Sequence, residues 1–144
     1  MEVLQCLQEL SKELLVSNDQ IAEEVSCQYI IKSLIDLLDK FLHIPEIALN
    51  SIICLNAFLD LNPLFTTTIV KNGGIPKIVM MTQNIEYIDI AENAIKAIEK
   101  ISTENTMVLL ENEALMNILN LIDFFELSLR VNNNLYRKSQ LKLV

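Results

Sequence analysis

The chain has 144 residues, enough for one domain, and only two glycines and three prolines punctuate it. Sandwich folds and doubly wound sheets need many tight turns, so this composition excludes both and favours a mostly helical domain. The net charge is −8, and all nineteen acidic residues precede position 127. An acidic body repels phosphate backbones, which argues against nucleic acid as a partner.

Residues that bind metals or form disulfides are few. Cys6, Cys27 and Cys54 have no paired spacing, and His43 has no ligand-spaced neighbour. We therefore expect no metal, no cofactor and no catalytic residues, with the thiols reduced in the core of a cytoplasmic and/or nuclear protein. The longest charge-free run, residues 47–59, is shorter than the ~18 residues of a membrane span, so no membrane partner is expected.

A helix is expected at residues 2–16, and the chain after it contains an internal repeat. Residues 46–55 align with residues 89–98 at an offset of 43. Ile31 and Ile75 occupy matching places in two shorter segments that are 44 residues apart. Periods of 40 to 44 residues are typical of armadillo and HEAT arrays.

The long helices expected at residues 44–60 and 87–103 each place apolar or small residues on one face, at steps of three and four. These two core faces consist of Ala48, Ser51, Leu55, Phe58 and Leu59 in the first, and Ala91, Ala94, Ile98 and Ile101 in the second.

Between the two long helices the sequence predicts a short helix followed by a medium one. Asn62-Pro63 is typical of a helix start, Gly73-Gly74 of a sharp bend that ends the short helix, and Pro76 of the first turn of the next. The order of short, medium and long helix is the armadillo arrangement.

The sequence thus predicts an all-α, armadillo/HEAT-like right-handed superhelix of about three repeats with incomplete ends. Residues 2–16 would end a preceding repeat, and the units 18–60, 63–103 and 104–143, the last one partial, would follow. Arrays that lack end caps associate readily, so self-association through the uncapped ends is a further expectation.

Two segments resemble a particular family. The pattern Ile88-Asp89-x-Ala91-Glu92 and the run Asp123-Phe124-Phe125 are similar to segments in the armadillo region of HECT-type E3 ubiquitin ligases of the ubiquitin-fusion-degradation class. Helix packing demands neither pattern, which makes them more specific than the general repeat.

The resemblance implies a parent protein that is a ubiquitin-protein transferase, with its catalytic HECT domain outside these residues. This chain would then be no enzyme but a module that recognises substrate, ubiquitin or ubiquitin chains in the ubiquitin-proteasome pathway. The alternative is an armadillo scaffold or nuclear-transport-type adaptor without ligase activity, although such adaptors use Trp ladders and this chain has no Trp.

The surface that we expect to bind protein is the outward ridge of the two long helices, opposite their core faces. At 100° per residue, the ridge positions are Glu46, Asn50, Ile53 and Ala57 in the first helix and Asp89, Asn93, Lys96 and Lys100 in the second. Such an arc can be a merely solvated face. However, two apolar residues in its middle would seat an aliphatic side chain of a partner.

Overall fold

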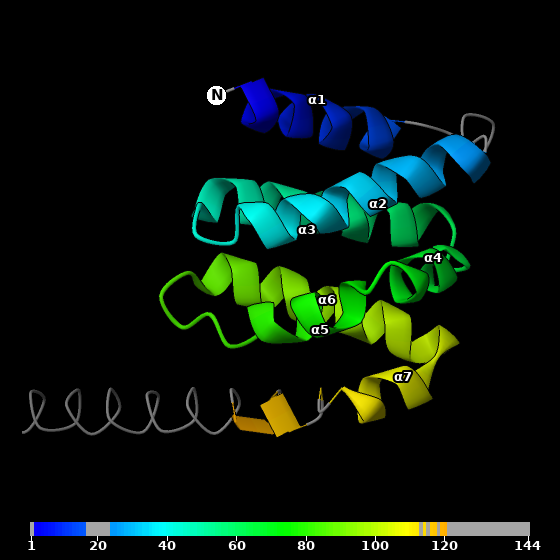
Figure 1. Ribbon diagram of the computed structural model, residues 1–144, viewed down its shortest axis with the longest axis vertical. Helices are drawn as coiled ribbons and strands as arrows, with labels where there is room; N and C mark the ends of the chain where they lie inside the picture. The colour runs from blue at the N-terminus through cyan, green and yellow to red at the C-terminus, as the bar shows by residue number, and fades with distance from the viewer. Residues whose placement is uncertain (1, 17–23, 113, 115, 118, 121–144) are drawn as a thin grey trace, which may run out of the picture.

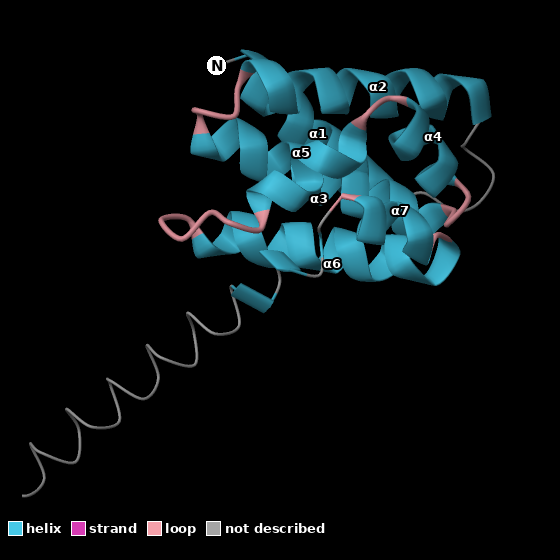
Figure 2. Ribbon diagram, turned by 60° about the horizontal axis from the view of Figure 1, so that its bottom comes forward, coloured by secondary structure: helices cyan, strands magenta, loops and turns pink. Residues whose placement is uncertain are grey.

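The computed structural model describes residues 2–16, 24–112, 114, 116, 117, 119 and 120. This part of the chain forms α-helices joined by short loops, and no strand occurs in it, as Figure 2 shows. The helices are α1 (Glu2–Val16), α2 (Glu24–Lys40), α3 (Pro45–Leu61), α4 (Phe65–Lys71), α5 (Gly74–Met81), α6 (Ile88–Glu104) and α7 (Thr106–Glu111). The all-α prediction is confirmed.

The helices stack in layers along the long axis of the molecule (Figure 1). Helix α1 packs on α3, and α3 packs on α6, so three long helices form one continuous row. Helix α2 covers α3 and also contacts α4 and α5, while α5 packs on α6. After α1, one layer therefore pairs α3 with α2, and the next pairs α6 with α5. Both layers contain one of the two long helices that the sequence repeat relates.

One apolar core runs through the layers. Every residue of the two predicted core faces is buried, because the 3.6-residue period of each helix turns those positions toward its neighbours. From the other side, α2 contributes Ile31, Leu34, Ile35 and Leu38 to the same core. Phe58 of α3 meets Phe65 of α4 edge to face, with ring centroids 5.9 Å apart.

The segment between α3 and α6 has the predicted short and medium helices, but the short one starts later than expected. Asn62 ends α3 instead of starting α4, which begins at Phe65. The Asn62 side chain still caps the following turn, because its Oδ1 accepts a hydrogen bond of 3.0 Å from the Leu64 N–H. Gly73 has φ +70°, the left-handed conformation of a bend, and Pro76 lies in the first turn of α5, as predicted.

The three thiols differ in exposure. Cys27 and Cys54 are buried, as predicted, whereas Cys6 is exposed and the expectation of a core position for it was wrong. The sequence period alone could not fix which face of α1 would be buried. Burial raises the pKa of Cys54 to about 11, and its Sγ lies 3.5 Å from the Leu7 carbonyl oxygen, to which the thiol donates.

We expect a thiol reagent at pH 8 to modify the exposed Cys6 rapidly and the buried Cys54 far more slowly, because only the thiolate reacts and burial raises the pKa of Cys54 to about 11. Mass spectrometry of chymotryptic peptides after timed labelling measures both rates. In urea the two rates should converge. Equal rates in the folded chain would contradict the burial of Cys54.

Helix α7 begins the predicted unit 104–143, but residues 121–143, including the Asp123-Phe124-Phe125 run, lie outside the described residues. The boundaries of the units therefore stay predictions. Among the described helices, none combines the length and the apolar composition that crossing a bilayer demands.

Candidate protein-interaction surface

The predicted ridge lies on α3 and α6, two helices that pack side by side. We call its eight residues the α3–α6 ridge: Glu46, Asn50, Ile53 and Ala57 of α3 and Asp89, Asn93, Lys96 and Lys100 of α6. Glu46, Asp89 and Lys96 are exposed, and the other five are half-buried. No member of the ridge is buried in the core, so all of them keep surface available to a partner.

The two asparagines of the ridge adopt the same local geometry one repeat apart. The Nδ2 of Asn50 donates to the Glu46 carbonyl oxygen and that of Asn93 to the Asp89 carbonyl oxygen, each over 2.8 Å. Both amides are thereby tied to the preceding turn of their own helix. Because the two asparagines occupy matching positions of the repeat, α3 and α6 present the same arrangement of acid and asparagine at the ridge.

The Lys100 ammonium group already has partners within the chain. Its Nζ lies 2.9 Å from Asp60 Oδ1 and donates to the Asn56 carbonyl oxygen over 3.3 Å, while Asn56 Nδ2 donates to the Asn93 carbonyl oxygen over 2.8 Å. These contacts join α3 to α6 at the seam between layers. Lys96, which is exposed and forms no ion pair among the described residues, is therefore the base that the ridge offers to a partner.

Asn56 is a residue of the seam that the sequence reasoning missed. It is 6% exposed, and its Oδ1 is buried without a hydrogen-bond partner. The sequence held one sign of this role, an amide side chain within the apolar run from Ile52 to Leu59. A polar side chain buried in such a run needs a hydrogen-bond partner, which only the tertiary structure supplies. For the Asn56 Nδ2 group, that partner is the Asn93 carbonyl oxygen.

Apart from the ridge, the described surface has an apolar groove between α1 and α2. It encloses about 660 Å³, and its apolar lining comes from both helices: Val3, Leu7, Leu10, Ile30, Leu34 and Leu37. Tyr29, which is 70% exposed, stands at its edge together with Cys6. The sequence pointed to residues 2–16 as an uncapped end but did not predict this groove, since it arises only when α1 and α2 both pack on α3.

In the described part of the chain, no group of three or more histidine, cysteine and carboxylate side chains could hold a metal ion. His43 is exposed in the loop between α2 and α3. What the described surface offers is a polar ridge with two apolar residues, an apolar groove and scattered charges, all of which suit contact with another protein.

The layered helices define an all-α repeat protein. Within that class, residues 1–111 match the sequence model of the family described as E3 ubiquitin-protein ligase TRIP12-like, TPR repeats. The chain belongs to this family, and the resemblance to a repeat region of E3 ubiquitin ligases is confirmed. The armadillo assignment of the repeats stays a prediction, beside a family description that names TPR repeats.

Two similar proteins come from Arabidopsis thaliana. E3 ubiquitin-protein ligase UPL4 is 33% identical over 85 residues, which is 59% of this chain and 6% of that protein. E3 ubiquitin-protein ligase UPL3 is 29% identical over 122 residues, 85% of this chain and again 6% of the relative. The chain thus spans about 6% of the length of each. No solved structure is significantly similar to it.

Proposed function

We propose that this chain is a non-catalytic protein-interaction module of a HECT-type E3 ubiquitin ligase and that it recognises substrate or ubiquitin. Its contribution to the reaction is binding and positioning, while the ubiquitin thioester forms on a cysteine of a HECT domain outside these residues. The two similar ubiquitin ligases, each far longer than this chain, support the proposal. A cytoplasmic or nuclear location goes with it.

The surface that we assign to recognition is the α3–α6 ridge. The observation that carries this assignment is the repetition of one edge in two adjoining layers, with an acid and a bonded asparagine at matching positions of α3 and α6. Beside the asparagines lie the half-buried Ile53 and Ala57 and the exposed Lys96. An aliphatic side chain of a partner would pack on Ile53, and an acidic neighbour of that side chain would pair with Lys96.

The double variant Ile53→Asp with Asn50→Ala tests this surface. We expect it to reduce capture of mono-ubiquitin or ubiquitin chains at least tenfold, because a carboxylate replaces the apolar contact at the centre of the interface. Stability should fall by only about 1 kcal/mol, since both side chains are half-buried. Pull-down with the immobilised variant and its melting temperature by circular dichroism measure the two effects.

A matched control is Ile85→Asp, which makes the same chemical change at an exposed isoleucine in the loop before α6. It should capture ubiquitin like the unchanged chain. Equal capture by the ridge variant and the control would remove the ridge from consideration. Failure of the unchanged chain to bind mono-ubiquitin or chains would overturn ubiquitin recognition.

The alternative function, an adaptor without ligase activity, rests on the acidic balance of the chain, which suits extended basic peptides. The same pull-down includes a lysine-rich peptide for this reason. Binding of that peptide, with no binding of ubiquitin, would favour the adaptor.

A further inference from the structure

A small pocket lies where α2 meets α4. It encloses about 250 Å³, and its lining side chains are all polar and none of them is acidic: Gln28, Tyr29, Lys32, Thr68, Lys71 and Asn72. Two helices contribute one lysine each. This lining contrasts with a chain that carries a net charge of −8.

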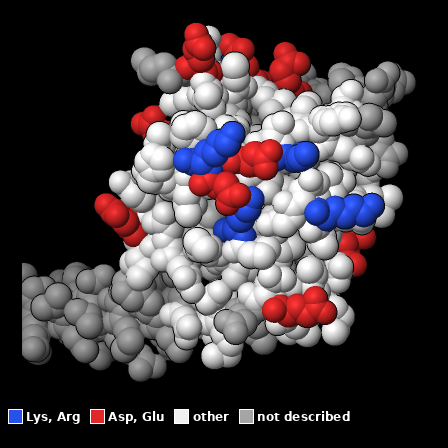
Figure 3. Space-filling model, viewed as in Figure 1, with Lys and Arg blue, Asp and Glu red and all other residues white. Residues whose placement is uncertain are grey.

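Within the described part of the chain, the two lysines of the pocket have no carboxylate partner. Lys32 and Lys71 are exposed, and neither forms an ion pair among the described residues. By contrast, Lys77 lies 2.6 Å from Asp39, and Lys100 is held by Asp60. Figure 3 shows basic side chains across the middle of this face, with acidic side chains between them as well as along its upper edge and margins.

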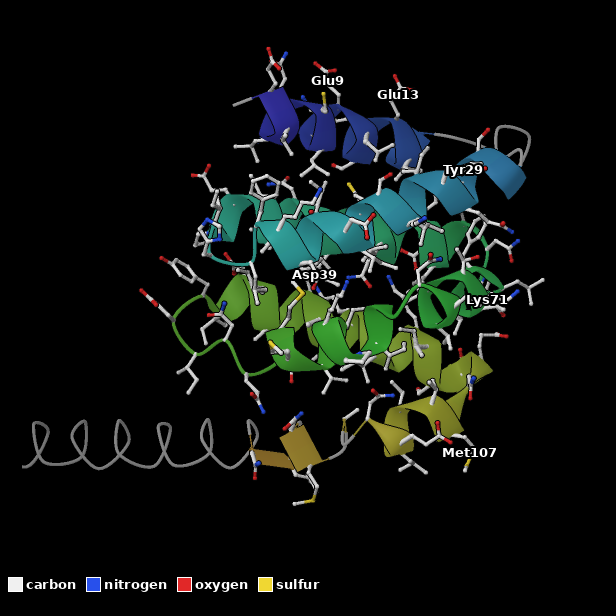
Figure 4. All side chains as sticks on the ribbon, in the orientation of Figure 1. Glu9, Glu13, Tyr29, Asp39, Lys71 and Met107 are labelled. Atoms are coloured by element: carbon white, nitrogen blue, oxygen red, sulfur yellow. The ribbon has the colours of Figure 1, made fainter. Side chains whose placement is uncertain are left out.

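Neutral donors surround the two cations. Tyr29 of α2 is 70% exposed and can direct its phenol O–H at a bound group, and the Gln28 amide lies beside it in the same lining. Figure 4 shows Tyr29 and Lys71 on the same side of the stack, at the right of the view, one on α2 and the other on α4. Two cations with neutral donors between them make a site that favours an anion.

Lys71 also occupies the last turn of α4, where a cation interacts favourably with the helix dipole. That end is capped without it, because Asn72 Nδ2 donates to the Thr68 carbonyl oxygen over 2.8 Å and the Asn72 N–H donates to the same oxygen over 3.2 Å. The Lys71 ammonium group therefore stays available. A neighbouring cavity brings Glu104 near this region without an ion pair to Lys71.

We propose that this pocket binds an anionic side-chain group, a carboxylate or a phosphoryl group, carried on an acidic peptide segment of a partner protein. A volume of about 250 Å³ admits one side-chain head group and is smaller than the roughly 300–1,000 Å³ of typical small-molecule sites. The acidic remainder of the chain repels a long polyanion such as nucleic acid, so a short peptide segment is the occupant that the charge distribution favours.

The test uses three fluorescein-labelled peptides of one length, whose central residues are glutamates, phosphoserines or glutamines. We expect the glutamate or the phosphoserine peptide to bind the chain in fluorescence anisotropy at low salt, and the glutamine peptide not to bind. The anionic peptide that binds more tightly shows whether the pocket prefers a carboxylate or a phosphoryl group. Binding should weaken as salt is raised, because both lysines are exposed and screened by ions.

The variant that tests the lysines is Lys32→Gln with Lys71→Gln. We expect it to weaken binding of the anionic peptide about tenfold, since two charge-assisted contacts are lost. The control, Lys12→Gln with Lys40→Gln, removes the same charge from exposed lysines outside this pocket and should change affinity less than about twofold. Equal losses in the two variants, or no binding of either anionic peptide, would overturn the proposal.

This site is independent of the α3–α6 ridge. The ridge variant Ile53→Asp with Asn50→Ala should bind the anionic peptide like the unchanged chain, and the lysine variant should still capture ubiquitin. The two proposals therefore fail separately.

Discussion

Replacing Phe58 with alanine should lower the free energy of unfolding by about 3–5 kcal/mol, the range for removing a buried aromatic side chain. Phe58 is 1% exposed and lies in the middle of the core that α3 shares with its neighbours. Truncation opens a cavity and also removes the edge-to-face contact with Phe65. Urea denaturation followed by circular dichroism measures the change.

Two further variants make that result specific. Phe58→Leu keeps most of the volume and should cost less than the alanine change, and Leu64→Ala removes a side chain that is 69% exposed and should cost about 0.5 kcal/mol or less. A loss below about 1 kcal/mol for Phe58→Ala would mean that the layers do not enclose this ring.

Gly74→Ala should destabilise the chain by about 1–3 kcal/mol, although alanine is the better helix former. Gly74 begins α5, and a Cβ built there would lie 2.7 Å from Ile69 Cγ2 and 3.1 Å from the Ile69 carbonyl oxygen. The backbone oxygen cannot turn away, so α4 and α5 would have to separate. Thermal unfolding by differential scanning calorimetry gives the change in melting temperature.

The adjacent glycine provides the control. At Gly73 a Cβ would meet nothing within 4 Å, but φ is +70°. Gly73→Ala should therefore cost about 1 kcal/mol through backbone strain alone. Gly73→Asn should cost less, because asparagine tolerates the left-handed conformation. A Gly74→Ala chain as stable as the unchanged one would show that α4 and α5 are not packed as described.

The helices and their buried faces followed from the sequence because both depend on local periodicity. Ala48, Leu55 and Phe58 recur at helical steps, and burial of one face is the only way to remove so many apolar side chains from water. The bend at Gly73 was also predictable, because few residues other than glycine take a positive φ. Each of these features depends on residues that lie close together in the sequence.

The contacts between layers were not predictable in the same way. Lys100 looked like a base on an open ridge, yet it pairs with Asp60, which lies one repeat earlier on α3. Asn56 reaches Asn93 across the same seam. Such pairs join residues about 40 positions apart, and their geometry depends on how the layers are rotated against each other, which a single sequence does not state.

The concave surfaces share this origin. The groove between α1 and α2 and the lysine pocket between α2 and α4 are each bounded by two helices that the chain brings together only after folding. Lys32 and Lys71 are separated by α3 in the sequence, so no motif links them. The helix positions of the ridge, in contrast, follow from the sequence because each of its rows lies on one helix, while its role in binding stays a prediction.

The most direct measurement of the proposed function is an NMR titration of the ¹⁵N-labelled chain with unlabelled ubiquitin. If the α3–α6 ridge recognises ubiquitin, the amide signals that shift should cluster at Asn50, Ile53 and Ala57 on α3 and at Asn93 and Lys96 on α6, with the signals of α1 unchanged. Shifts confined to the groove between α1 and α2, or no shifts at saturating ubiquitin, would contradict this account.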